Sequence, residues 1–176
     1  VVAEAGCPWV LMHWRGHSAG MQARANYQDV VAEVCDELRK RYEAAAEGGV
    51  APESIILDPG LGFAKLPAHN WILLAHLDRI LSLGRPVLVG ASRKRSLGET
   101  TASAHARPRP SDEREDATIA VSAIAALAGA WGVRVHDVAG SVDAVKVAAA
   151  VRALTSVPES DSSLSSSRAT LRSAIV

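Results

Sequence analysis

Residues 55–63 read Ile-Ile-Leu-Asp-Pro-Gly-Leu-Gly-Phe, a short apolar run that ends in an acidic residue and a Pro-Gly turn. Aliphatic β-branched residues favour strands, whereas Pro and Gly interrupt them, so this stretch predicts a buried strand over 55–58 and then a loop. The apolar residues of the following stretch, 69–83, lie on one side of a helix that stops at Gly84. Strand, loop and helix together form one βα unit.

The same unit occurs three more times, with strands predicted over 9–12, 86–90 and 133–137 and helices over 27–47, 111–130 and 141–154. The helix over 27–47 has the clearest apolar stripe, with residues three or four apart: Val30, Val34, Leu38, Tyr42 and Ala45. A long loop over 99–110 precedes the third helix, for which Ser111 and Asp112 suit the N-cap.

This alternation predicts an α/β fold with a parallel sheet whose strands end on one rim. Four units are half of a (β/α)₈ TIM barrel, which needs about 250 residues, so the sequence predicts a half-barrel fragment. An open doubly wound sheet is the alternative, although the Gly-x-Gly-x-x-Gly turn of dinucleotide-binding sheets is absent.

Composition limits the classes of function. Nineteen basic residues balance nineteen acidic ones among 176, which argues against a nucleic-acid surface or a polybasic membrane patch. No apolar stretch reaches the roughly 20 residues that span a bilayer, so we expect a cytoplasmic protein without membrane contact. The two cysteines, Cys7 and Cys35, are expected to be buried as small hydrophobic residues.

The two ends of the chain differ from the repeated units. Val1 begins in helical sequence, which suggests a fragment of a longer protein. Eight of the 22 residues in 155–176 are Ser, without a hydrophobic period, which predicts a disordered tail after a domain over 1–154.

Polar side chains at strand ends are the most informative feature for function. In the fourth strand, alternation puts Val133 and Val135 on one face and Arg134 and His136 on the other, facing the barrel interior. An Arg beside a His matches the charge and geometry of a phosphate group, so we favour anion binding. A salt bridge from this face to an acidic residue across the barrel is the alternative.

Asp58 ends the second strand and is followed by two glycines and Phe63. An ionised Asp accepts hydrogen bonds from amide-like or guanidine-like edges of a ligand, while Gly60 and Gly62 let the backbone approach it and Phe63 forms a wall. A turn-capping role is an equally good interpretation of Asp58, because Asp-Pro-Gly is common in turns.

The third strand is followed by Ser92 and three cations, Arg93, Lys94 and Arg95. Such a run usually forms a solvated loop, but at a strand's carboxyl end we expect at least one cation to turn into the site. Lys94 could donate to a carbonyl oxygen, and Ser92 could bind a carboxylate. In the first strand, Met12 offers an apolar platform or core packing.

A zinc site is not expected at His13 and His17. These residues are four apart, but they lie across a strand end and a loop rather than on one helix. Ser-His-Asp order, a Walker loop and Cys-x-x-Cys are also absent.

Three segments resemble signatures of dihydropteroate synthase, in the family's order: Leu-Asp-Pro-Gly-Leu-Gly-Phe-Ala-Lys at 57–65, Val-Gly-Ala-Ser-Arg-Lys at 89–94 and Arg-Val-His-Asp-Val at 134–138. Leu-Met-His at 11–13 resembles a fourth, weaker one. The resemblance implies the last four units of a (β/α)₈ barrel. It also implies a reaction, in which 6-hydroxymethyl-7,8-dihydropterin diphosphate and para-aminobenzoate give 7,8-dihydropteroate and pyrophosphate in folate biosynthesis.

The resemblance also implies residue roles. Asp58 would bind the pyrimidine edge of the pterin, and Lys94 its carbonyl. Arg134 would cover the ring and reach the diphosphate, which His136 would bind as well; Lys94, Arg134 and His136 are thus the expected catalytic residues. Ser92 would hold the aminobenzoate carboxylate. The remaining residues expected to shape the pocket are Phe63, Met12 and Gly90. All these groups are expected to converge around one small cavity.

Cofactor and assembly are likewise implied only by resemblance: Mg²⁺ bound with the diphosphate, a homodimer when full length, and inhibition by sulfonamides. The family's Asn ligand for the metal belongs to the N-terminal half, so no metal ligand is expected in this chain. Ser96 stands where the family usually has a bulky apolar residue, which could loosen that loop. Two alternatives are a methyltetrahydrofolate-binding methyltransferase barrel and an inactive paralogue or truncated pterin-binding fragment.

Overall fold

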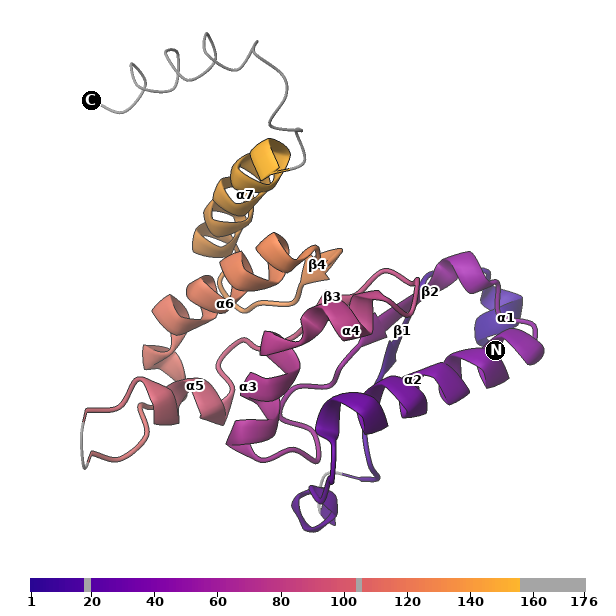
Figure 1. The fold of residues 1–176 in the computed structure, drawn as a ribbon, viewed down its shortest axis with the longest axis horizontal. Coiled ribbons are helices and arrows are strands. Elements are labelled where there is room, and N and C mark those ends of the chain that lie inside the picture. The colour runs from indigo at the N-terminus through magenta and orange to yellow at the C-terminus, as the bar shows by residue number, and fades with distance from the viewer. Residues whose placement is uncertain (18–19, 104–105, 156–176) are drawn as a thin grey trace, which may run out of the picture.

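A computed structural model of the chain describes residues 1–17, 20–103 and 106–155. The strands form two parallel pairs: β1 (Trp9–Met12) with β2 (Ile55–Asp58), and β3 (Leu88–Val89) with β4 (Gly132–Val133). Trp9 lies opposite Ile55 and Met12 opposite Asp58, and a parallel bridge between Leu57 and Val87 connects β2 to β3 (Figure 1). The fold is therefore α/β with a parallel arrangement of strands, as predicted.

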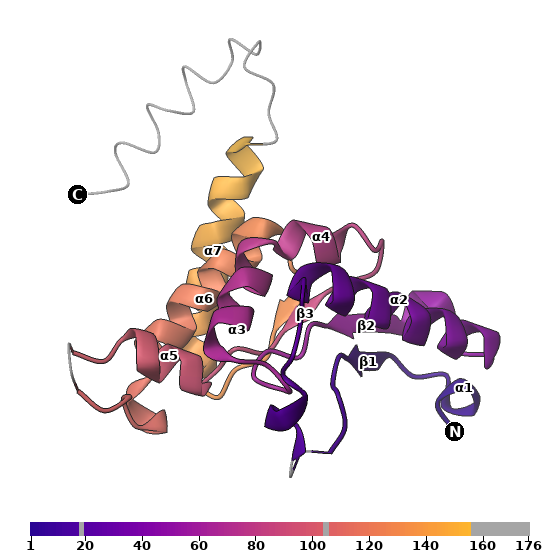
Figure 2. The ribbon, with the colours of Figure 1, turned by 60° about the horizontal axis from the view of Figure 1, so that its bottom comes forward.

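Helices follow each strand. They are α1 (Val2–Ala5), α2 (Val30–Glu47), α3 (Pro67–Ala75), α4 (Leu77–Leu81), α5 (Arg95–Thr100), α6 (Glu115–Ala128) and α7 (Val138–Thr155), with 3₁₀ turns η2 (Gln22–Arg24), η3 (Pro52–Ser54) and η4 (Ser111–Glu113). Figure 2 shows α2 and α4 on one side of β1 and β2, so the helices cover one face of these strands. The core between the layers is aliphatic; its most buried side chains include Val34, Leu38, Ile55, Leu57, Leu73, Leu77, Ile80, Val87 and Val89.

Helix α2 forms where its capping residue and apolar stripe predict. Asp29 is the N-cap, and its Oδ1 accepts hydrogen bonds from the backbone N–H groups of Val31 and Ala32, both at 3.0 Å. Of the predicted stripe, Val30, Val34 and Leu38 are buried, while Tyr42 and Ala45 pack against the core. The predicted start at residue 27 was three residues early.

The other helices differ from their predicted bounds. The helix predicted over 69–83 is two helices, because His76 has non-helical torsions (φ −116°, ψ 36°) between α3 and α4. Ser111 and Asp112 lie in η4 and do not cap α6, whose N-cap is Arg114 without a side-chain capping bond. Helix α5 was not predicted, and α7 begins three residues before Ser141.

Three further features concern the predictions made from composition. Cys35 is buried as expected, but Cys7 is exposed just before β1, so its predicted burial was wrong. Among the described residues, none of the helices is both long and apolar enough to cross a bilayer. The predicted Ser-rich tail lies outside the described residues from position 156 onward, and Thr155 is the last residue of α7.

Candidate ligand site at the strand ends

Asp58 and Arg134 lie 76 residues apart in the chain and meet at the carboxyl ends of β2 and β4. Arg134 Nη2 donates to Asp58 Oδ2 at 3.0 Å, while Asp58 Oδ1 accepts the backbone N–H of Gly60 at 2.7 Å. The Asp58 side chain is 1% exposed and that of Arg134 is 56% exposed. The salt bridge that we considered as the alternative to anion binding is thus present, although much of the guanidinium remains open to solvent.

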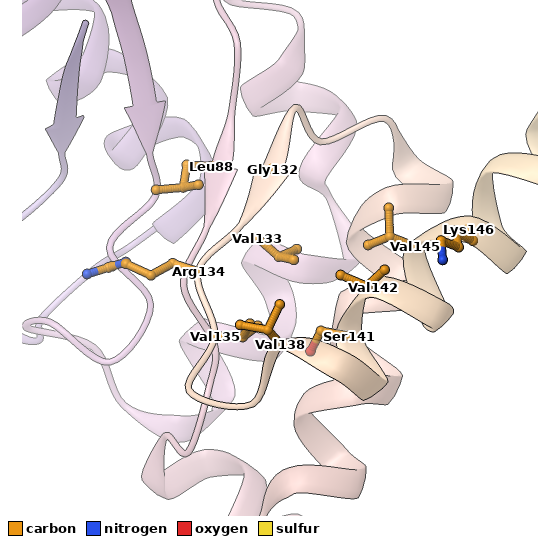
Figure 3. Close-up of a pocket in the computed structure, with 10 residues that line it drawn as sticks. All are labelled: Leu88, Gly132, Val133, Arg134, Val135, Val138, Ser141, Val142, Val145 and Lys146. Carbon is orange, nitrogen blue, oxygen red and sulfur yellow. The ribbon is translucent and has the colours of Figure 1, made fainter.

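The predicted alternation of faces after β4 is seen in part. Val133 packs against the aliphatic core. Arg134 points away from the apolar groove beside it, whereas Val133, Val135 and Val142 point toward that groove (Figure 3). The strand ends at Val133, so both Arg134 and His136 extend from the loop after β4 rather than from the strand itself.

Burial raises the pKa of the Asp58 carboxyl above its usual value. The N–H of Gly60 and the positive charges of Arg134, Lys94 and Lys65 act in the opposite direction. The rim therefore presents a desolvated carboxylate surrounded by three cations, an arrangement that favours a ligand with hydrogen-bond donors beside a negatively charged group.

Of the three consecutive cations after β3, only Lys94 turns toward this carboxylate. Its Nζ lies 4.2 Å from the centroid of the Phe63 ring, a cation–π contact. Burial and the charge of Arg134 lower the pKa of Lys94. Arg93 instead pairs with Glu115 on α6, and Arg95 pairs with Glu99 one turn along α5.

Ser92 and His136 form a second contact across the rim. The backbone N–H of His136 donates to Ser92 Oγ at 3.2 Å, and Ser92 Oγ lies 2.8 Å from His136 Nδ1. A hydroxyl has one donor and two acceptor lone pairs, so Ser92 Oγ can hold the backbone N–H and either tautomer of the His136 ring. The Ser92 hydroxyl is thus engaged by His136 rather than open to a carboxylate, and the His136 side chain is exposed.

Two glycines let the rim close up. A Cβ on Gly90 would lie 2.5 Å from Arg134 Nη2, so the absence of a side chain there makes room for the guanidinium. Gly60 has φ +66°, and a Cβ on it would lie 1.9 Å from the carbonyl oxygen of His13 and 3.4 Å from Met12 Cγ. Met12, only partly buried, therefore lies against the loop that follows Asp58.

A buried polar network that was not predicted lies beneath this loop. Lys65 Nζ lies 2.8 Å from His13 Nδ1, and His13 Nε2 lies 3.0 Å from Glu37 Oε2 on α2. Glu37 also binds Arg15. Nothing in the local sequence of Lys65 signalled this role, because its partners lie 52 and 28 positions away or belong to the backbone of its own loop.

No metal site is found where His13 and His17 were considered. His13 is engaged by Lys65 and Glu37, while His17 is exposed and stacks edge-on against Trp14. Throughout residues 1–17, 20–103 and 106–155, no group of three or more His, Cys, Asp or Glu side chains is arranged to hold a metal ion.

The expected single cavity is not observed. Lys94 and Gly62 border a cleft of about 330 Å³ between α3 and α5, whereas Arg134 borders a groove of about 610 Å³ between β4 and α7. Asp58 borders neither of these two spaces. Asp58 and Arg134 converge by direct pairing of their side chains.

A parallel arrangement of strands with charged and hydrogen-bonding groups at its carboxyl rim places the chain among α/β proteins, in which this rim is the common position of a ligand site. The sequence model of the family described as "Pterin binding enzyme" matches residues 1–136. The chain belongs to this family.

Its relatives are dihydropteroate synthases. The enzyme of Mycobacterium leprae is 56% identical over 151 residues, which are 85% of this chain and 53% of that protein. The Thermus thermophilus enzyme in complex with 6HMPPP matches with a TM-score of 0.78 and 40% identity, over 85% of this chain and 57% of that one. The Xanthomonas albilineans enzyme in complex with 7,8-dihydropteroate matches with a TM-score of 0.74 and 43% identity, over 89% and 54%. The chain therefore spans about half the length of the relatives it matches.

Proposed function

We propose that this chain forms the last four βα units of a (β/α)₈ barrel with dihydropteroate synthase activity. The barrel would condense 6-hydroxymethyl-7,8-dihydropterin diphosphate with para-aminobenzoate, giving 7,8-dihydropteroate and pyrophosphate. The observation that carries the proposal is the buried Asp58 carboxylate, paired with Arg134 and flanked by Lys94 on one rim. The complexes of the relatives with 6HMPPP and 7,8-dihydropteroate support this choice of ligand.

The pterin would bind between Asp58 and Lys94. Its pyrimidine edge carries N–H donors, which suit the acceptor-only carboxylate of Asp58, and its carbonyl suits the ammonium of Lys94. Arg134 now occupies one carboxylate oxygen, but its largely exposed side chain is free to swing away. We propose that the guanidinium is displaced from Asp58 by the pterin and then covers the ring face.

The diphosphate would lie against the guanidinium of Arg134 and the imidazole of His136. As the bond between the pterin methylene and the diphosphate oxygen breaks, negative charge grows on the leaving group, and preorganised donors stabilise it more than they stabilise the ground state. The methylene becomes cationic, and the electron-rich ring spreads that charge. The aniline nitrogen then forms the new C–N bond and releases its proton, a step that depends on positioning rather than on a dedicated general base.

The aminobenzoate, the metal and the assembly complete the proposal. Phe63 forms a wall for the aromatic ring beside Lys94, and Ser92 reaches the carboxylate if its bond to His136 rearranges. The described residues do not form a metal-binding group, so Mg²⁺ would arrive with the diphosphate and take protein ligands from elsewhere in the barrel. We also propose that the complete barrel is a homodimer.

A chimera tests the proposed activity. This chain would replace the matched segment of the M. leprae enzyme, to which it is 56% identical. We expect the chimera to form dihydropteroate, because the inserted chain supplies Asp58, Lys94, Arg134 and His136. We expect the chain alone to show no turnover, since half a rim lacks the rest of the pocket. A folded but inactive chimera would contradict the assignment and favour an inactive paralogue.

Variants of the chimera test the diphosphate site. Arg134→Ala and His136→Ala should each weaken the affinity for the diphosphate substrate about tenfold to a hundredfold, the range for a charged hydrogen bond, and leave the affinity for free 6-hydroxymethylpterin within about threefold. Titration calorimetry with both ligands measures this difference. Equal losses for both ligands would show that these residues do not form an anion site, and a methyltransferase-type barrel would then be favoured.

A further inference from the structure

The loop between Asp58 and Lys65 has an unusual backbone. Gly60, Gly62 and Ala64 all have left-handed torsions, with φ values of +66°, +78° and +49°. Alternating turns of this kind direct several carbonyl oxygens to one side, where each needs a donor once it is buried. The carbonyl of Ala64 is bound by the Tyr27 hydroxyl at 3.0 Å. Those of Gly60 and Phe63 both face Lys65.

Lys65 satisfies these carbonyls with an ammonium group that is itself fully bonded. Its Nζ donates to Gly60 O at 3.2 Å and to Phe63 O at 3.1 Å, and lies 2.8 Å from His13 Nδ1. An ammonium has three N–H donors, and three acceptors surround it. The residue is 3% exposed, so water does not replace a lost donor at low cost.

His13 serves as the third acceptor in a fixed protonation state. It is fully buried, and its Nε2 faces the Glu37 carboxylate at 3.0 Å, so the ring proton lies on Nε2 and Nδ1 is free to accept. Burial and the adjacent charge of Lys65 lower the pKa of His13 to about 3, which keeps the ring neutral beside the ammonium.

Every element packed around Lys65 contributes a charged or titratable group. Asp58 faces it from β2, Arg15 and His13 from the end of β1 and its loop, Glu37 and Arg41 from α2, and His69 from α3. Burial is the largest influence and lowers the pKa of Lys65 to about 7, despite the favourable charges of Asp58 and Glu37.

We propose that Lys65 is a positioning residue: its buried Nζ, through its bonds to Gly60 O and Phe63 O, holds the loop 59–64 in the turn that presents Asp58 and Phe63 to the pterin. The inference rests on the proposed pterin site, but the state of the loop can be measured without a ligand. Opening of the loop exposes Nζ to water, where a Lys binds its proton more strongly than in the buried site, so opening takes up a proton and becomes less favourable as the pH rises above 7.

The amides of the loop provide the first test, with the complete chain. The N–H groups of Gly60, Gly62 and Phe63 are bonded to Asp58, Asn70 and Gly60 O, so hydrogen exchange reports their opening. After correction for intrinsic rates, we expect their protection to rise about tenfold between about pH 7 and pH 9 in the wild type, relative to amides of α2. In Lys65→Met, protection should be low throughout and independent of pH. Exposed Lys40→Met is the matched control and should follow the wild type.

Pterin affinity provides the second test. Titration calorimetry with 6-hydroxymethylpterin should give an affinity about tenfold lower for Lys65→Met than for the wild type, with Lys40→Met as the control. If the wild type does not bind the pterin, the proposed function fails, while the exchange experiment still decides the role of Lys65. Should Lys65→Met not fold, the wild-type exchange profile decides alone. Loop protection that is flat or falls from about pH 7 to pH 9, or a folded Lys65→Met variant with wild-type protection, would overturn the inference.

Discussion

At the residue scale, burial and neighbouring charges have opposite effects on the pKa of the Asp58 carboxyl. Asp58 is withdrawn from water, which raises its pKa, yet it lies among Arg134, Lys94 and Lys65. Removing one partner of such a group leaves a buried charge uncompensated, so single substitutions here are expected to have large effects. Arg134 is different, because its exposed guanidinium can be solvated when the contact to Asp58 is broken.

Asp58→Asn tests whether this carboxylate recognises the pterin. The amide has nearly the same shape, but one acceptor oxygen becomes a donor facing the N–H groups of the ligand. We expect the affinity of the chimera for 6-hydroxymethylpterin to fall about a hundredfold, or about 3 kcal/mol, as measured by titration calorimetry. Exposed Asp78→Asn on α4 is the control. Unchanged affinity in Asp58→Asn would reduce Asp58 to a turn residue.

The pH dependence of unfolding tests the environment of Lys65. Its pKa is lowered from 10.5 to about 7 in the folded chain, so between these values the unfolded state holds a proton that the folded state has released. The associated stability is present above pH 10.5 and is lost as the pH falls through 7.

We therefore expect the free energy of unfolding of the wild type to rise relative to Lys65→Met by up to about 1.4 kcal/mol per pH unit above pH 7. Urea denaturation at several pH values from about 7 to 9 measures this difference. Parallel profiles for the two proteins would show that Lys65 keeps an ordinary pKa.

At the element scale, local sequence patterns predicted the bounds of an element best where residues of that element or beside it set its ends. The bounds of β1 and β2 were correct, and the apolar stripe of α2 is buried as predicted. Strands β3 and β4 are two residues each, shorter than predicted, because only Leu88 and Val89 pair with Gly132 and Val133. The break at His76 and the helix α5 carry no Pro or Gly signal at their ends, so no local pattern indicated them.

The N-cap of α2 allows a test at this scale. Asp29→Ala removes the acceptor of two backbone N–H groups and should lower the free energy of unfolding by about 1 kcal/mol, as measured by urea denaturation. Asp36→Ala lies on the same helix and loses only an exposed pair with Arg39, so it should cost less than about 0.5 kcal/mol. Equal effects would mean that capping does not stabilise α2.

At the scale of the whole molecule, both outer strands leave apolar surface uncovered. Trp9, Val10, Leu11 and Trp14 line a hollow beside β1. On the opposite side, Val133, Val138, Val142 and Val145 line the groove between β4 and α7 (Figure 3). Surfaces of this kind in a barrel are covered by neighbouring units, and uncovered they favour association.

We expect the chain alone to associate as its concentration rises through about 10–100 µM, as measured by sedimentation velocity. Val142→Lys places a charge in the groove and should shift association to higher concentration. Ala150→Lys adds the same charge on an exposed position of α7 outside the groove and should not. A monomer at all concentrations would contradict the prediction that these surfaces need a partner.

The sequence by itself determined the α/β class, the parallel strands and the placing of Asp58, Lys94 and Arg134 at the strand ends, because periods of two and of three to four residues are local properties of the chain. Only the tertiary structure decided which of these groups pair. Arg134 with Asp58, Ser92 with His136 and Lys65 with His13 are contacts across 76, 44 and 52 residues. Such contacts depend on how the helices and strands pack and on which buried donors and acceptors then lie within hydrogen-bonding distance. The spacing of residues along the chain does not determine either.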